Sequence, residues 1–173
     1  MNDYDIFSFM PGDESRVDAD KRQFRNVLGE YATGVAVAAT VAPSGEKIGL
    51  TINSFASVSL EPPLILWSLA KISDAVEVFR AANRFSISVL AANQEALALH
   101  FAGQTENKFT AVEHRSVTGG VPVLTGCAAY FDCASEASHP GGDHVILVGR
   151  VEKFASRGRP ALIFHQGRFK SLD

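Results

Sequence analysis

Short polar side chains gather in one segment of the sequence, between two apolar runs. The segment from Gly49 to Leu66 reads GLTINSFASVSLEPPLIL and carries almost no charge. A flat ring with carbonyl and imide groups at its edge is the kind of ligand that small hydroxyl and amide groups on a rigid strand–loop–strand element suit. An ordinary turn rich in Ser and Thr is the alternative. The side chains in question are Thr51, Asn53, Ser54, Ser57 and Ser59.

A second group of residues suits a phosphate. The sequence predicts a short helix that begins with a cap at Ser73 or Asp74 and runs to about Ala82. Backbone N–H groups at a helix start, together with the helix dipole, favour an anion, and Lys71 lies two residues before Ser73. A plain helix cap beside a solvated lysine is the alternative.

His144 differs in context from the other four histidines. It follows Gly141-Gly142-Asp143, which we place in a loop over residues 139–143, and it opens the apolar strand VILVGRV. At the rim of a barrel its imidazole would donate a hydrogen bond to a substrate carbonyl or amide. A structural or surface role is the alternative. No HExxH motif or close histidine pairing occurs, so no metal centre is predicted.

Several nucleotide and hydrolase motifs are missing from the sequence. No GxGxxG follows the first predicted strand, and neither GxxxxGK[ST] nor GxSxG occurs. A Rossmann site, a P-loop and a serine nucleophile therefore lack support. The chemistry is predicted to belong to a bound cofactor.

The elements that must position these residues are mostly short strands. A helix is expected from Asp18 or Asp20 to Thr33-Gly34, with an apolar stripe toward the body at Phe24, Val27, Leu28 and Tyr31. Another helix is expected over residues 94–102, and a long loop over 103–120. Regular helical crossovers are missing, which favours a closed antiparallel barrel with helices packed outside. Strands are predicted at residues 35–41, 47–52, 57–60, 64–69, 85–90, 123–136, 144–154, 161–164 and 168–172.

Composition limits the possible partners and the location. The chain has 173 residues, 46% of them hydrophobic, and a net charge of -3, so we expect one domain with a real core and no nucleic-acid partner. No apolar run is long enough to span a membrane, and the first 20 residues are acidic where a signal peptide would be basic. We expect residues 1–17 to form a flexible arm and 18–173 a single domain.

The two cysteines point to a reducing compartment. Cys127 and Cys133 are predicted to lie on one face of one strand, with Cα atoms roughly 20 Å apart. They are then too far apart to bridge, since a disulfide needs Cα atoms within about 7 Å. Free thiols fit a cytoplasmic protein.

The order of segments resembles the flavin reductase-like family of split-barrel FMN-binding proteins. The similarity covers residues 22–173 and is strongest to the short-chain NAD(P)H:flavin reductases that supply reduced flavin to two-component flavin monooxygenases. The combination of a TxNSFxSVSxxPP segment with a GDH loop is specific. The segments that carry it are YATGVAVAA at 31–39, GLTINSFASVSLEPPL at 49–64, FSISVLAANQEALALHFAG at 85–103, NKF at 107–109 and GGDHVILVGRV at 141–151.

The resemblance implies a mainly β fold, a Greek-key split β-barrel with a few peripheral helices, and a homodimer that holds FMN or FAD in a groove near the subunit interface. It implies that His144 faces the nicotinamide of NADH or NADPH and that Asp143 orients it. Ile72 and Ala75 stand where hydroxyl residues are common in phosphate anchors. The flavin contacts that it implies are Thr51, Asn53, Ser54, Ala56, Ser57, Val58, Ser68, Lys71, Ser73, Lys108 and Phe109.

The resemblance also implies a reaction, in which a hydride passes from nicotinamide C4 to flavin N5. The reduced flavin then serves a partner monooxygenase. One rival is a non-catalytic flavin-binding or storage protein on the same barrel. Another is an oxidase of the pyridoxine-phosphate type, which should need more basic residues near the site than Lys71, Lys108 and Arg150.

Overall fold

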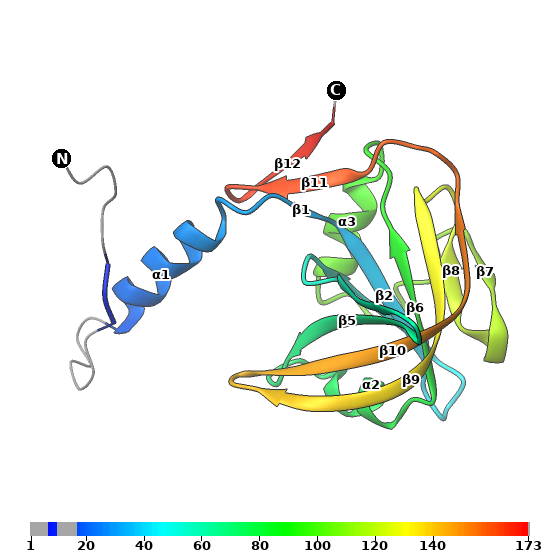
Figure 1. Cartoon of the computed structure of the whole chain (residues 1–173). Helices are drawn as coiled ribbons and strands as arrows, with labels where there is room; N and C mark the ends of the chain where they lie inside the picture. The colour runs from blue at the N-terminus through cyan, green and yellow to red at the C-terminus, as the bar shows by residue number, and fades with distance from the viewer. Residues whose placement is uncertain (1–6, 10–16, 173) are drawn as a thin grey trace.

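A seven-stranded antiparallel sheet, curled on itself, forms the body of the protein (Figure 1). The computed structural model describes residues 7–9 and 17–172. Its mainly β character and split-barrel closure confirm the predicted fold class. In order across the sheet, the strands are β3 (Lys47–Ile52), β2 (Ala36–Val41), β6 (Arg84–Val89), β9 (Ala129–Gly141), β10 (His144–Ser156), β5 (Pro63–Ala70) and β4 (Ala56–Leu60).

The two edge strands of this sheet are neighbours in the chain. β3 ends at Ile52 and β4 begins at Ala56, so residues 53–55 alone join opposite edges. Four residue steps reach at most about 14 Å, which forces the sheet to curl until its edges meet. The edges are joined by the chain and do not pair with each other, which makes the barrel split. We call residues 53–55 the edge joint.

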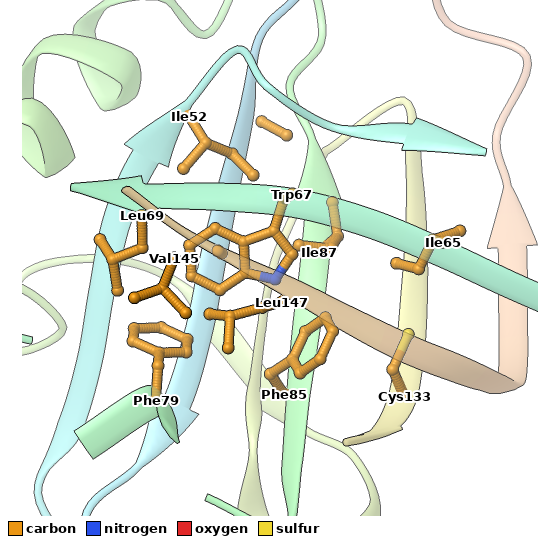
Figure 2. Packing of buried hydrophobic residues seen from close by; sticks show 12 residues of the cluster. Ile52, Ile65, Trp67, Leu69, Phe79, Phe85, Ile87, Cys133, Val145 and Leu147 are labelled. Atoms are coloured by element: carbon orange, nitrogen blue, oxygen red, sulfur yellow. The ribbon is translucent and has the colours of Figure 1, made fainter. Parts of the chain in front are cut away.

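The barrel interior is organised around Trp67. Alternate residues of β5 point inward, and the Trp67 side chain is fully buried. Its ring centroid lies 4.9 Å from that of Phe79 on α2 (Val76–Ala81) and 5.9 Å from that of Phe85, both edge-on. Figure 2 shows these rings among Leu69, Val145 and other aliphatic side chains. Packing of this kind fixes where β5 and β10 lie.

A second core lies on the outer side of the barrel wall. The strand β2, which is Val and Ala except for Thr40, is buried on both faces, because its alternate residues contact α3 (Glu95–Ala102). Val37 and Ala39 pack there with Phe101 and Phe109. Gly49 allows this contact, since a Cβ there would lie 2.8–2.9 Å from the two aromatic rings.

Smaller sheets complete the fold. β1 (Thr33–Gly34), β11 (Leu162–His165) and β12 (Arg168–Ser171) form a three-stranded sheet. β7 (His114–Ser116) pairs with β8 (Pro122–Leu124), and a 3-10 turn spans Thr118–Gly120. The long loop predicted over residues 103–120 is therefore wrong in its second half.

The β9–β10 hairpin corrects two predictions. Its strands pair up to Gly141 and His144, so the predicted loop at 139–143 shrinks to a two-residue turn at Gly142-Asp143. Pro140 masked this extension in the sequence, because proline usually marks a break in a strand. Cys127 lies before β9 and does not share a strand with Cys133, although both are free and buried.

Burial raises the pKa of the Cys133 thiol to about 12, and it also raises that of Cys127. These shifts follow from the cost of a thiolate in an apolar interior.

The helix α1 (Val17–Leu28) contradicts a further prediction. It ends before the expected Thr33-Gly34, and none of its residues is buried. The stripe predicted to face the body is 49–78% exposed and consists of Phe24, Val27, Leu28 and Tyr31. Figure 1 shows the helix projecting away from the barrel. Amphipathic spacing predicts a helix correctly, but it does not say which surface covers the apolar side.

The arm predicted for residues 1–17 lies almost wholly outside the described residues. Within 7–9 and 17–172, no helix has both the length and the apolar character needed to cross a membrane.

We expect Gly149→Ala to destabilise the barrel by about 1–3 kcal/mol through overpacking. A Cβ at Gly149 would overlap the Phe85 ring and lie 3.0 Å from the Cβ of Cys133. The free energy of unfolding in urea would measure this. Gly34→Ala is the matched control, since a Cβ there meets nothing within 4 Å. Equal stability of the two variants would contradict the packing described here.

Candidate functional site

A solvent-open hollow of about 290 Å³ lies beside the edge joint, where β3 and β5 end and β10 begins. It brings together side chains from segments far apart in the sequence. Six of the predicted site residues line it, namely Thr51, Asn53, Ser54, Ser68, Ser73 and His144.

Strand pairing explains why these residues meet. In the antiparallel register of β10 and β5, His144 lies opposite Ala70 and Ile146 opposite Ser68. The hydroxyl of Ser54 donates to the carbonyl of Ser68 at 3.1 Å and accepts from its N–H at 3.0 Å. The edge joint is thus tied to β5, which fixes one wall of the hollow.

Some polar side chains of the hollow already form hydrogen bonds within the protein, and others do not. Thr51 donates its hydroxyl to the carbonyl of Ala98 at 2.6 Å, which fixes β3 to α3. The Ser73 hydroxyl accepts from the N–H of Ala75 at 3.3 Å. Asn53 is exposed, and neither its side chain nor the Ser68 hydroxyl has a hydrogen-bond partner in the described part of the chain. Asn53 and Ser68 therefore have the most capacity for a ligand.

The turn at Gly142-Asp143 is held against β5. The N–H of Lys71 donates to the carbonyl of Asp143 at 2.9 Å, and its ammonium donates to the carbonyl of Gly142 at 2.6 Å. Lys71 therefore supports the turn that carries His144. Its remaining ammonium donors are still available to an anion at the rim.

Asp143 orients His144. Its carboxylate lies 2.7 Å from Nδ1 of the imidazole. This hydrogen bond, reinforced by the charge of the imidazole, lowers the pKa of Asp143. With Nδ1 engaged, Nε2 is the ring nitrogen left for a ligand.

The strand β4 offers backbone groups to the same region. It is an edge strand with β5 as its only neighbour in the sheet, and Ala56, Ser57 and Val58 are exposed. A register shift between Ser57 and Ser59 leaves Val58 without a partner residue on β5. The predicted use of backbone and hydroxyl groups at these positions is compatible with this exposure.

Two predicted residues lie elsewhere. Phe109 is only 6% exposed and packs on Phe101, with ring centroids 5.0 Å apart. Lys108 donates to the carbonyls of Phe101 at 2.9 Å and Gly49 at 3.4 Å, and burial lowers its pKa. This geometry gives a flavin contact by Phe109 no support within a single chain.

The phosphate anchor is weaker than the sequence suggested. The helix α2 begins at Val76, three residues after Ser73, and is only six residues long. Its N-cap is Ala75, and no side chain caps it. Any phosphate contact here would depend on the side chains of Lys71 and Ser73 rather than on a helix dipole.

Sequence reasoning missed the apolar lining of the hollow. Leu50, Leu69 and Ala70 also line it, and in the sequence they resemble ordinary core residues. Only the register between β5 and β10 shows that Ala70 lies beside His144. Among residues 7–9 and 17–172, no cluster of three or more His, Cys, Asp or Glu side chains is suited to a metal ion.

Comparison with known protein families decides what this site belongs to. A family model described as the flavin reductase like domain matches residues 28–173. The chain belongs to the flavin reductase like family.

Two relatives of this flavin reductase align with most of its sequence. The FMN reductase (NADH) SmoA of Agrobacterium fabrum is 44% identical over 161 residues, which is 93% of this chain and 88% of SmoA. The reductase subunit HsaB of a flavin-dependent monooxygenase from Mycobacterium tuberculosis is 35% identical, over 89% of this chain and 83% of HsaB. The first name is that of a reductase of FMN, and the second is that of the reductase subunit of a flavin-dependent enzyme.

A solved structure shares the fold. The NADH:FAD oxidoreductase SgcE6 of Streptomyces globisporus, in complex with NAD and FAD fragments, superposes with a TM-score of 0.85 at 37% identity. The match covers 90% of this chain and 94% of that one.

The residues of the hollow fit a flavin ring. Their free groups are a neutral amide, a hydroxyl and an imidazole nitrogen, and these suit the carbonyl and imide edge of such a ring. The apolar part of the lining suits its flat faces. The volume is at the low end of ligand sites, which run from roughly 300 to 1,000 Å³.

We expect His144→Ala to raise the pKa of Asp143 toward its ordinary value, since the hydrogen bond that lowers it is lost. Carboxyl ¹³C NMR across an acid titration would follow the group. His139→Ala is the control, because His139 is exposed on β9 and, among the described residues, forms no hydrogen bond or ion pair with Asp143. A pKa for Asp143 that is unchanged in His144→Ala would contradict the orienting contact.

Proposed function

We propose that this flavin reductase oxidises NADH and reduces FMN or FAD in the hollow beside the edge joint, and that the reduced flavin serves a partner monooxygenase. The observation that carries the proposal is the meeting of Asn53, Ser68 and His144 in one hollow of a flavin reductase fold. The names of SmoA, HsaB and SgcE6 support the same cofactors and partner class.

The contribution of the protein to the reaction is to orient the flavin and nicotinamide rings relative to each other. Bound flavin and nicotinamide supply the chemistry, a hydride acceptor at flavin N5 and a donor at nicotinamide C4. Asn53, Ser68 and the outer edge of β4 would hold the flavin edge, and the apolar lining would cover its face. His144, fixed through Nδ1 by Asp143, would donate from Nε2 to the carbonyl of the nicotinamide amide. No residue needs to transfer a proton in the hydride step, so orientation is the main contribution.

NADH is the donor that we propose. Three of the chain's relatives, SmoA, a flavin reductase of Rhodococcus and SgcE6, carry NADH in their names, and NADPH is tested in the same assay. The flavin is exchangeable in this proposal, because the hollow of a single chain is small and open.

A homodimer is part of the proposal. The apolar stripe of α1 is exposed and lies away from its own barrel (Figure 1). Exposed apolar surface of this extent on one helix is typical of an interface. A second copy that covers it would also help to enclose a groove for the flavin. We further propose that residues 18–173 fold as one domain, and that the two free thiols belong to a protein of the cytoplasm.

We expect the purified chain to oxidise NADH only when FMN, FAD or riboflavin is added or already bound, as followed by nicotinamide absorbance. Tight flavin binding without oxidation of either nicotinamide would instead favour the storage protein.

Replacing His144 with alanine should lower kcat/KM for NADH about three- to tenfold, the cost of one neutral hydrogen bond. Because the residue positions the nicotinamide, turnover should persist. His139→Ala should behave like the parent protein. Unchanged NADH kinetics in His144→Ala would remove this histidine from the active site.

The double variant Val27→Glu/Leu28→Glu should shift the protein from dimer to monomer in light scattering after size exclusion, since two carboxylates would be buried at the interface. Asn26→Glu adds a charge on the opposite face of α1 and should leave the mass unchanged. A monomeric parent protein would overturn the dimer.

A further inference from the structure

A second cleft lies at the far end of the β9–β10 hairpin. Its volume is about 290 Å³, and its walls come from β8, the start of β9 and the end of β10. His144 pairs with Gly141 at one end of the hairpin, whereas Ser156 pairs with Ala129 at the other. The twelve residue steps between His144 and Ser156 amount to about 40 Å of strand. The two linings share no residue, so this cleft is distinct from the proposed reaction site.

The cleft is positively charged. Arg115 and Arg157 line it, and Arg159 lies beside it with its guanidinium 3.1 Å from the carbonyl of Gly126. Across residues 7–9 and 17–172, none of these three arginines forms an ion pair, not even with the exposed Glu113. Three guanidinium charges without carboxylate partners leave a positive potential that a ligand can neutralise.

A thiol in the cleft responds to the same charges. Burial raises the pKa of Cys127, and Arg157, Arg115 and Arg159 all act in the opposite direction. All three arginines are thus close enough to act on one point in the lining.

The remaining walls are apolar or aromatic. The guanidinium of Arg115 lies over the ring of Tyr130, 4.6 Å from its centroid. This stacking holds the planar guanidinium in place while its N–H groups remain available at the edge. Val123, Leu124 and Ala155 supply aliphatic surface. A ligand here would meet positive charge on one side and apolar surface on the other.

We propose that this cleft binds a small organic anion, a carboxylate attached to an aromatic or aliphatic body. Arginine matches a carboxylate with two parallel hydrogen bonds, which suits the charged side of the cleft. The apolar walls suit the body of such a molecule. A bare inorganic anion would leave those walls solvated, and a neutral molecule would leave the arginines unpaired. The proposal does not depend on the hydride reaction.

Calorimetric titration of the whole 173-residue chain at low salt tests the proposal with three probes. Benzoate has the charge and the apolar body, benzamide has the body alone, and inorganic phosphate has the charge alone. We expect saturable benzoate binding that weakens as salt is added. Benzamide and phosphate should bind at least about tenfold more weakly, since each lacks one half of the recognition.

The variant Arg157→Gln identifies the site. Arg157 keeps its backbone hydrogen bond to Ala128 in this variant, so the fold should be preserved while one charge is lost. We expect benzoate binding to weaken about tenfold or more. Arg168→Gln, which removes an exposed charge on β12, should bind benzoate like the parent protein. Arg115→Gln provides a second, independent variant of the cleft.

Each variant should also oxidise NADH in the presence of flavin at the rate of the parent protein, because none of these arginines lines the hollow. Loss of benzoate binding with normal NADH oxidation would separate this proposal from the reductase activity. If benzamide bound as tightly as benzoate, the proposed role of the arginines in binding the carboxylate would be wrong. If phosphate bound as tightly as benzoate, the proposed role of the apolar walls would be wrong. Benzoate binding that Arg157→Gln leaves unchanged, or no binding because a second copy covers Tyr130, would overturn the site itself.

Discussion

The closure of the sheet by three residues is the constraint on which the rest of the structure depends. Residues 53–55 join the two edges, so the barrel can close only where this segment lies. A closure without hydrogen bonds between β3 and β4 leaves side chains and backbone groups accessible at the joint. The two hydrogen bonds between the Ser54 hydroxyl and the backbone of Ser68 hold the joint against β5. The position of the ligand site thus follows from topology, and its polarity follows from the residues at the joint.

This arrangement suits a reaction in which the cofactors do the chemistry. A protein that only aligns two rings needs rigid walls and a few well-directed donors. The walls are firm here because Trp67 and its neighbours pack β5 and β10 together (Figure 2). One donor is directed by a second contact, since His144 is held through Nδ1 by Asp143 and keeps Nε2 for a ligand.

Local patterns in the sequence predicted most of the elements and about half of the site. Alternation and turn residues located β2, β3, β5 and β6, because each lies between clear breaks and buries one or both faces. The grouping of Thr51, Asn53 and Ser54 with His144 came from family resemblance, since the residues lie about 90 positions apart and only the barrel brings them together. The flavin contact that the resemblance implied for Phe109 is not supported, because this residue packs in the core against Phe101. An aromatic residue beside a lysine can belong to a core as well as to a ligand site. The surface that covers α1 is equally invisible to periodicity, which describes one helix and not its neighbour.

The two buried cysteines have a consequence for the durability of a protein with this activity. Reduced flavin that meets oxygen in free solution generates hydrogen peroxide, and peroxide attacks the thiolate form of cysteine. With a pKa of about 12, Cys133 exists as thiolate in only about one molecule in 100,000 at neutral pH. Burial also raises the pKa of Cys127, although three nearby arginines act in the opposite direction. Burial of the Cys133 sulfur therefore gives that residue a chemical resistance to the oxidant that stray reduced flavin would produce around the protein.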